Sequence, residues 1–432
     1  MQILSSLPYK LTPLDTTTDP AAPEITFVVK GTFALKPGAP CEPVDAGEQK
    51  EFSGDVVYMD KIGRSLRYAS DLAPFKPFGE VLVTANAHAP DRLPATSVDV
   101  GLAIGPIGKR LRVHGDRVWL RDPQGEFYIE GPMPFVEMAL RWERSFGGLD
   151  NRQNPLGRGL EPWLEEDGRK HFFLANIEDP ENPLRGKDHS PEPAGFAPIA
   201  PHWEPRASRE GTRDRHWAAF IAPLPPRDFD PRVTQAAPAD QWLKGYWNGD
   251  ETFKLVNMHP QHPEFLGSLP GKRLRLFIEM LLDPAAGTGA TGFAEVRLDL
   301  DTVHIDMTEE RLRLVWRKHI KVSAAGAPEI AFAYLAEEPL AEEPWPIARH
   351  HEDFLKLKPP SPEDERAAFA RDEQAALADA RKNLVEAKVS PDFLARFDAA
   401  PDSPAKFALV LDLMTAKTAE LEALAAAAPK AA

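Results

Sequence analysis

The chain has 432 residues, of which 43% are hydrophobic and 27% are charged, a composition typical of a soluble globular protein with at least one sizeable core. Its formal net charge of −15 disfavours general binding to nucleic-acid phosphates. Cys41 is the only cysteine, which excludes a disulfide within the chain and a zinc site built on several cysteines. The N-terminus lacks the pattern of a signal peptide, and no apolar stretch is long enough to span a bilayer. We therefore expect a cytoplasmic protein without membrane insertion.

The first 150 residues carry short strand-like runs separated by proline and glycine. In residues 24–36, polar and apolar side chains alternate, and Gly31 interrupts the pattern, which predicts a strand with a bulge or bend. Glycines within residues 101–108 predict a β-hairpin, and His114-Gly115-Asp116 predicts a second tight hairpin turn. Similar strand patterns occupy residues 80–88, 98–104 and 109–120. Strands of this length without intervening helices favour an antiparallel sandwich over a parallel sheet.

Residues 151–265 show no continuous periodicity and are rich in proline and tryptophan. We expect long ordered loops with a few short elements, because large aromatic side chains hold irregular backbone against a core. The tryptophans of this region are Trp163, Trp203, Trp217, Trp242 and Trp247.

Strand patterns return after residue 265. Residues 271–283 and 293–322 are rich in apolar residues at alternate positions. Arg311, Arg313 and Arg317 alternate with leucine and tryptophan, which predicts half-buried strands with one face in water. The whole pattern predicts a mainly β protein of antiparallel β-sandwich-like units with long ordered loops, followed by an α-helical C-terminal segment.

The C-terminal segment is rich in alanine, glutamate, lysine and leucine, which favour helices. Three Ser-Pro pairs, beginning at Ser361, Ser390 and Ser403, have the form of a helix N-cap followed by proline at the first helical position. They predict helices over about 362–388, 391–398 and 404–427. In the third helix one face is apolar, through Phe407, Val410, Leu411, Met414, Leu421 and Leu424. This face could close a helical hairpin on itself or bind a partner.

These patterns divide the chain into four expected regions. They are an N-terminal β domain (1–150), a loop-rich region packed on the β domains (151–265), a second β unit (266–346) and a C-terminal helical hairpin (360–428).

The residues show no motif of a known kind of catalytic or cofactor site. His259 and His262 are each followed by proline, so they cannot share one helical face as a metal-binding pair. No G-x-S-x-G sequence is present, and the glycines of residues 101–108 lack the spacing of a dinucleotide-binding loop. We expect a non-enzymatic protein without a catalytic residue, metal or cofactor. A hydrolase or carbohydrate-binding β protein that uses the central tryptophan- and histidine-bearing loops is the alternative.

A series of motifs resembles a bacterial family of proteins first catalogued as a domain of unknown function and encoded beside type VI secretion loci. The motifs occur in one order over about residues 5–335, and the helical tail lies outside them. They are YASDLAPFKP from Tyr68, ANAHAP from Ala85, KRLRVHGDRVW from Lys109, WERSFGG from Trp142, NPLGRG from Asn154, GTRD from Gly211 and PADQ from Pro238.

The resemblance implies an adaptor or chaperone that stabilises a secreted effector protein and loads it onto the secretion spike beside a PAAR-like tip protein. The family supplies no catalytic residue. Among the motif residues we expect a set that binds the partner or holds the motifs in place. They are Asp71, Lys76, Asp116, Trp142, Arg144, Phe146, Asn154 and Arg158. For Arg144 and Arg158 we expect structural pairing with carboxylates such as Glu143 or Asp150.

Overall fold

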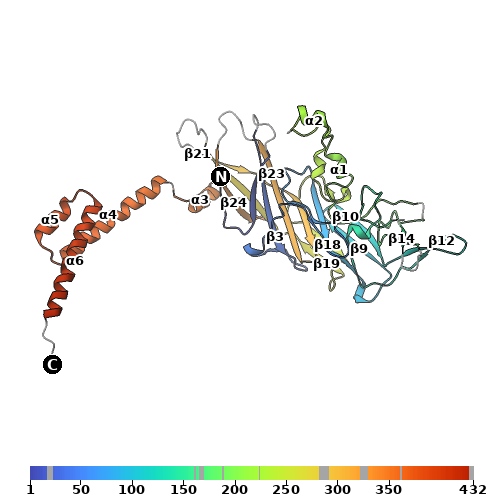
Figure 1. The fold of residues 1–432 in the computed structure, drawn as a ribbon, viewed down its shortest axis with the longest axis horizontal. Coiled ribbons are helices and arrows are strands. Elements are labelled where there is room, and N and C mark those ends of the chain that lie inside the picture. Colours follow the sequence, from blue (N-terminus) through green and yellow to red (C-terminus); the bar gives the residue numbers. More distant parts are fainter. Residues whose placement is uncertain are drawn as a thin grey trace, which may run out of the picture. The chain divides into compact units, whose positions relative to one another are not determined.

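The structure is a computed structural model that describes residues 1–16, 23–159, 162–164, 170–186, 189–222, 224–281, 291–321, 329–360 and 362–427. The chain divides into two compact units, Met1–Lys356 and Leu357–Ala432. The first unit is mainly β and the second is helical (Figure 1), which confirms the expected fold class. In the part of the chain described, no helix is long and apolar enough to cross a bilayer.

The largest sheet joins strands from both ends of the first unit. Its order is β17 (Trp242–Leu243), β7 (Gly79–Thr84), β22 (Asp299–Asp306), β23 (Arg311–Lys321), β3 (Glu24–Ala34) and β2 (Lys10–Asp15), and β4 (Glu42–Pro43) also pairs with β3. Neighbours run antiparallel except β7 and β22, which are parallel. Strands from residues 1–150 and 266–346 therefore share one sheet rather than forming separate layers.

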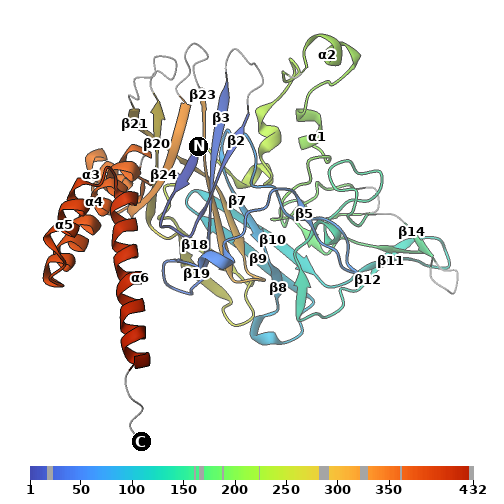
Figure 2. The same cartoon turned by 60° about the vertical axis from the view of Figure 1, so that its left-hand side comes forward.

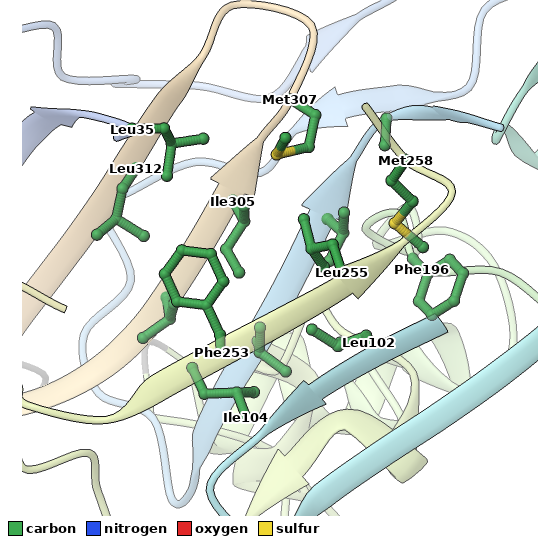
Figure 3. Close-up of a cluster of buried hydrophobic side chains, with 14 of the residues drawn as sticks. Leu35, Leu102, Ile104, Phe196, Phe253, Leu255, Met258, Ile305, Met307 and Leu312 are labelled. Atoms are coloured by element: carbon green, nitrogen blue, oxygen red, sulfur yellow. The ribbon is translucent and has the colours of Figure 1, made fainter. Parts of the chain in front are cut away.

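A second sheet lies face to face with the first and encloses the main core. Its order is β16 (Ile177–Glu178), β10 (Ile107–His114), β9 (Ser97–Ile104), β18 (Thr252–Val256) and β19 (Glu264–Ser268). Figure 3 shows Phe253 and Leu255 of β18 directed toward Ile305 and Leu312 of the large sheet. The apolar positions of both sheets alternate with polar ones, so each sheet presents one apolar face to the shared core.

A third sheet and one helix complete the sandwich. The sheet order is β1 (Gln2–Leu4), β24 (Glu329–Pro339), β20 (Lys272–Leu281) and β21 (Thr291–Val296). Helix α3 (Ile347–Leu357) contributes the fully buried Phe354, which packs with Phe277 and Tyr334 of this sheet. Helix α3 lies before the first helix predicted from the sequence, which begins at about residue 362.

The central region contains more regular structure than the long loops expected. β18 and β19 lie in it, as do α1 (Arg206–Arg209) and α2 (Arg215–Phe220). A small sheet has the order β12 (Phe127–Glu130), β11 (Val118–Arg121), β15 (Lys170–Phe173) and β14 (Pro162–Leu164). Two further pairs join β8 (Asn86–His88) with β13 (Glu137–Ala139), and β5 (Val56–Val57) with β6 (Leu66–Tyr68). In Figure 2 this small sheet and α2 project from the sandwich.

Two local predictions for the β strands are wrong. The turn at residues 114–116 does not form a hairpin, because β10 pairs with β9 and β16 whereas β11 pairs with β12 and β15. The hairpin lies at Gly105-Pro106, as the glycines of residues 101–108 predicted. At Gly31 the pairing of β3 with β23 continues without a bulge. A side chain at position 31 would clash with the Phe33 ring, because a Cβ there would lie 2.8 Å from the nearest ring carbon. Packing of Phe33 therefore explains the glycine.

The second unit consists of α4 (Pro362–Glu386), α5 (Pro391–Ala399) and α6 (Ser403–Ala427), so the three expected helices are confirmed. Ser390 caps α5, since the backbone N–H of Phe393 points at its hydroxyl at 3.4 Å. The hydroxyl expected to cap α4 belongs to Ser361, outside the described residues. Asp402 rather than Ser403 caps α6, accepting the Ala405 N–H at 2.8 Å.

Among the described residues, the apolar face expected on α6 is mostly exposed, with Val410 half-buried. Leu384 of α4 and Phe397 of α5 are buried, whereas Phe407, Leu411 and Met414 of α6 are exposed. The side chains of Leu421 and Leu424 lie outside the described residues.

Candidate functional site

A polar cluster centred on Asp116 joins three of the sequence motifs, those that contain Asp116, Arg144 and Arg158, with Asn176. Asp116 Oδ1 accepts hydrogen bonds from Arg144 at 3.0 Å, from Arg158 at 3.2 Å and from the Asn176 side chain at 3.0 Å. Both arginines also donate to Asn176 Oδ1. The carboxylate that pairs with them is therefore Asp116, not Glu143 or Asp150. Glu143 instead accepts hydrogen bonds from Ser65.

The charge of Asp116 is stabilised in the folded state. Burial raises its pKa, but the hydrogen bond from Asn176 and the charges of Arg144 and Arg158 outweigh burial, so the pKa lies below its ordinary value. A carboxyl whose pKa is lower in the folded state than in the unfolded state stabilises the fold. This stabilisation is complete above the unfolded pKa, which is about 3.9 for Asp. That contribution is lost as the pH falls through the lower pKa of the folded state.

Asp116→Asn is expected to lower the free energy of unfolding at pH 7 by about 0.5–1 kcal/mol, because the carboxylate is half exposed and its ion pairs are screened. The loss relative to the wild type shrinks as the pH falls below about 4. Urea unfolding followed by tryptophan fluorescence at pH 7 and pH 3 measures both values. Asp150→Asn, on an exposed loop residue, is the control and changes neither. A difference that grows toward acid contradicts the assignment.

The segment from residue 140 to residue 159 forms a compact belt beside the Asp116 cluster. The fully buried Asn154 side chain donates to the carbonyl oxygens of Trp142 at 2.8 Å and Phe146 at 2.9 Å. A Cβ at Gly157 would lie 2.4 Å from the Asn154 amide nitrogen, so only glycine fits there. The belt thus fixes Trp142, whose indole donates to the Pro198 carbonyl at 2.9 Å.

Asp71 and Lys76 lie in a second cluster, on the face of the large sheet that turns away from the main core. Lys30 of β3 donates to Asp71 at 2.5 Å, and Lys76 pairs with Glu80 and donates to Thr302 at 3.0 Å. Arg317 pairs with Asp301 and also donates to the Asp71 carbonyl at 2.7 Å. We call Lys30, Asp71, Lys76, Glu80, Asp301 and Arg317 the buried charge cluster; each is no more than 6% exposed.

The prediction that this face of β23 lies in water is wrong. Arg313 and Arg317 are 3% and 2% exposed, because residues 52–78 pass over this face and exclude solvent. Burial lowers the pKa of Lys30 and lowers that of His304, on the same face, to about 3. The burial of this face could have been inferred from the charges of the two strands. Asp299 and Asp301 lie opposite lysine and arginine on the neighbouring strand, a pattern typical of cross-strand ion pairs.

A wide cleft of about 890 Å³ lies between the second sheet and the central region. Its walls are residues 108–111 of β10, residues 179–182 after β16, residues 192–194, and residues 204–206 at the start of α1. Trp142 and Trp242 also line it. Of the residues expected to be functional, only Trp142 reaches the cleft. The Asp116 cluster and the belt support its wall, and the buried charge cluster lies elsewhere.

The aromatic rings at the cleft are already covered by other side chains. Trp142 packs edge-on against Trp203, with ring centres 6.3 Å apart, and Gly195 lies against its ring. Trp242 stacks on Phe78 at 5.8 Å, and the Arg209 guanidinium lies 5.2 Å over its ring. Neither tryptophan offers a free face on which a sugar could stack.

A sequence model of a protein family described as "Uncharacterized protein conserved in bacteria (DUF2169)" matches residues 21–317. The chain belongs to this family. The match includes the Asp116 cluster, the belt and the buried charge cluster, and it ends within β23. No curated protein and no solved structure matched the chain.

His259 of this DUF2169 chain stabilises the backbone around it. His259 Nδ1 accepts hydrogen bonds from the backbone N–H groups of Gln261 and His262, both at 3.1 Å, so it closes a turn. Within the described ranges, no three or more His, Cys, Asp or Glu side chains are placed to hold a metal ion.

Cys41 of this DUF2169 chain is expected to resist thiol reagents until the protein unfolds. It is 3% exposed, and burial raises the pKa of its thiol to about 11, so little of the reactive thiolate forms near neutral pH. Reaction with Ellman's reagent at pH 8, with and without urea, measures this. Titration of one thiol within seconds in the absence of urea would show that the side chain is accessible.

Proposed function

We propose that the protein is a non-enzymatic adaptor that stabilises a type VI secretion effector and loads it onto the secretion spike beside a PAAR-like tip protein. The order of its motifs resembles that of adaptors of this kind. Its charged motif residues form ion pairs within the protein instead of converging on one solvent-accessible point where a substrate could bind. Asp116 pairs with Arg144 and Arg158, and Asp71 pairs with Lys30. Groups used in this way position loops.

The observation that supports the proposal is the wide cleft, whose wall includes Trp142 held by the belt. Its lining is polar and charged, and its tryptophans are covered, which suits contact with a polypeptide better than enclosure of a small molecule. Helix α2 projects from the sandwich (Figure 2). Its Phe220 side chain is 78% exposed. The projecting small sheet also exposes Tyr128 and Ile129. Exposed apolar groups on projecting elements are typical of surfaces that bind proteins.

The test is co-expression of the full chain with the proteins encoded next to it, among which the proposal expects the effector. The effector is expected to co-purify with the chain, and its steady-state amount falls several-fold when the adaptor gene is deleted. Secretion of the effector into the medium falls with it. An effector that is equally abundant and equally secreted without the chain contradicts the proposal.

A further inference from the structure

One edge of the second sheet is left open beside the cleft. β10 pairs with β9 along its whole length but with β16 only at Arg112 and Val113. On the β16 side, His114 N–H donates to the Asn176 carbonyl at 2.7 Å. Because backbone groups alternate in direction along an antiparallel strand, Gly108 and Arg110 direct their N–H and C=O groups to that same side. No described residue forms a strand pairing with them there.

The opposite edge of the same sheet is covered by the chain itself. At β19, the N–H of Gly38 donates to the Leu266 carbonyl at 2.7 Å, and the N–H of Cys41 donates to the Ser268 carbonyl at 3.2 Å. Proteins normally cover or interrupt such edges, because an open edge pairs with any extended chain. The open stretch of β10 is therefore a feature that a partner strand can use.

The cleft provides room for that strand. Residues 108–111 form one wall, and residues 179–182, which leave β10 after the short β16, form another. A Cβ built on Gly108 would meet no atom within 4 Å, so no described side chain covers the face of the sheet at this end of β10. A strand lying in this space would continue the line of β16 along β10.

The charged residues that line the cleft indicate which side chains a bound strand would carry. Lys109 is held by Asp240 and by the carbonyl of Gly195, and Arg206 donates to the carbonyls of Val233 and Ile199. Asp179, Glu181 and Glu192 also line the cleft. Asp179 accepts the Glu181 N–H at 2.9 Å and lies near the Lys109 ammonium, whereas the Glu181 and Glu192 carboxylates pair with no cation among the described residues. Arg110 and Arg209 also line the cleft, and each lies near a carboxylate that is not in the lining, Asp99 and Asp230 respectively. The carboxylates of the cleft thus remain available to a basic ligand.

We infer that the cleft binds an extended segment of a partner protein that carries lysine or arginine at alternate positions, and that this segment adds to β10 as an extra strand. The backbone groups of Gly108 and Arg110 supply the pairing, and Asp179, Glu181 and Glu192 supply the preference for basic side chains. The inference rests on the proposed adaptor function for the partner's identity as the effector.

The test uses the full chain and two fluorescein-labelled peptides, four repeats of Lys-Val and four repeats of Glu-Val, in fluorescence anisotropy. The Lys-Val peptide is expected to bind at least tenfold more tightly. Arg110→Pro removes the outward N–H without affecting the pairing with β9, and proline is tolerated at such edge positions. It should weaken Lys-Val binding at least tenfold. Arg110→Ala keeps the N–H and should bind at least as tightly as the wild type.

Equal binding of both peptides, or equal binding by Arg110→Pro and Arg110→Ala, overturns the inference. If Arg110→Pro does not fold, hydrogen exchange of the wild-type Gly108 and Arg110 amides replaces it. Saturating Lys-Val peptide is expected to slow their exchange at least tenfold, and unchanged rates overturn the inference. An effector that still co-purifies with a chain that binds no peptide leaves the adaptor function intact on another surface. If the chain binds the Lys-Val peptide but no effector co-purifies with it, the adaptor function is contradicted and the inference about β10 is not.

Discussion

Arg317→Ala is expected to lower the free energy of unfolding of the first unit by about 3–5 kcal/mol, because it leaves Asp301 charged, buried and without its cation. Asp301 is 1% exposed, and its remaining polar contact is the Thr302 hydroxyl at 2.7 Å. Loss of Arg317 also removes the hydrogen bond to the Asp71 carbonyl. Urea unfolding followed by tryptophan fluorescence measures the loss. The signal reports on the first unit, since every tryptophan precedes residue 346.

The pH dependence of this variant distinguishes a buried charge from a general packing defect. Burial already raises the pKa of Asp301, and removal of Arg317 raises it further. A carboxyl whose folded pKa lies above its unfolded value is less destabilising at low pH, when it is protonated. The gap between wild type and Arg317→Ala should therefore be larger at pH 8 than at pH 5. A gap that is independent of pH contradicts the assignment.

Two further variants control for the substitution itself. Arg311→Ala lies on the same strand, but its side chain is 31% exposed and pairs with the exposed Glu48, so it should cost less than about 1 kcal/mol. Replacing Asp301 and Arg317 together by leucine removes both buried charges, and it should recover most of the stability lost by Arg317→Ala. If the double variant is less stable than Arg317→Ala, the pair itself, rather than the orphaned carboxylate, governs the effect.

The parts of the fold that sequence predicts well are those in which local patterns decide the structure. The three helices of the second unit follow from composition and, for α5, from the Ser-Pro start, because capping and propensity act within a few residues. The hairpin at Gly105-Pro106 likewise depends on its two central residues. The turn at His114-Gly115-Asp116 shows the limit of this reasoning. Its residues permit a hairpin, but the partners of β10 and β11 come from distant segments.

The candidate site depends on such distant partners. Arg144 and Arg158 are recognisable as cations that need a carboxylate, but Asp116 lies 28 and 42 residues away. Arg313 and Arg317 alternate with apolar residues as they would on a wet face, and only the passage of residues 52–78 over the sheet turns that face into an interior. The open edge of β10 cannot be predicted from the sequence. It exists because β16 has only two residues and therefore pairs with only part of β10.

Asn154→Ala is expected to lower the free energy of unfolding by about 2–4 kcal/mol, because it leaves two buried carbonyl oxygens, of Trp142 and Phe146, without their donor. The same belt holds Trp142 in the wall of the cleft, so the amount of co-purified effector should fall together with stability. Arg152→Ala is the matched control from the same loop. Its side chain is 82% exposed, and it should change stability by less than about 0.5 kcal/mol and leave the effector yield unchanged.

The two readouts separate a supporting role of the belt from direct contact with the partner. Partial restoration of stability, by lower temperature or a stabilising osmolyte, should restore effector binding by Asn154→Ala if the belt acts only through the wall of the cleft. An Asn154→Ala chain as stable as the wild type that still lost the effector would place the belt in the interface itself. The Asp116 cluster lies on the same segment through Arg144 and Arg158, so Asp116→Asn should then show the same loss of effector at nearly unchanged stability. Its effector yield decides between a belt that shapes the cleft and a belt that touches the partner.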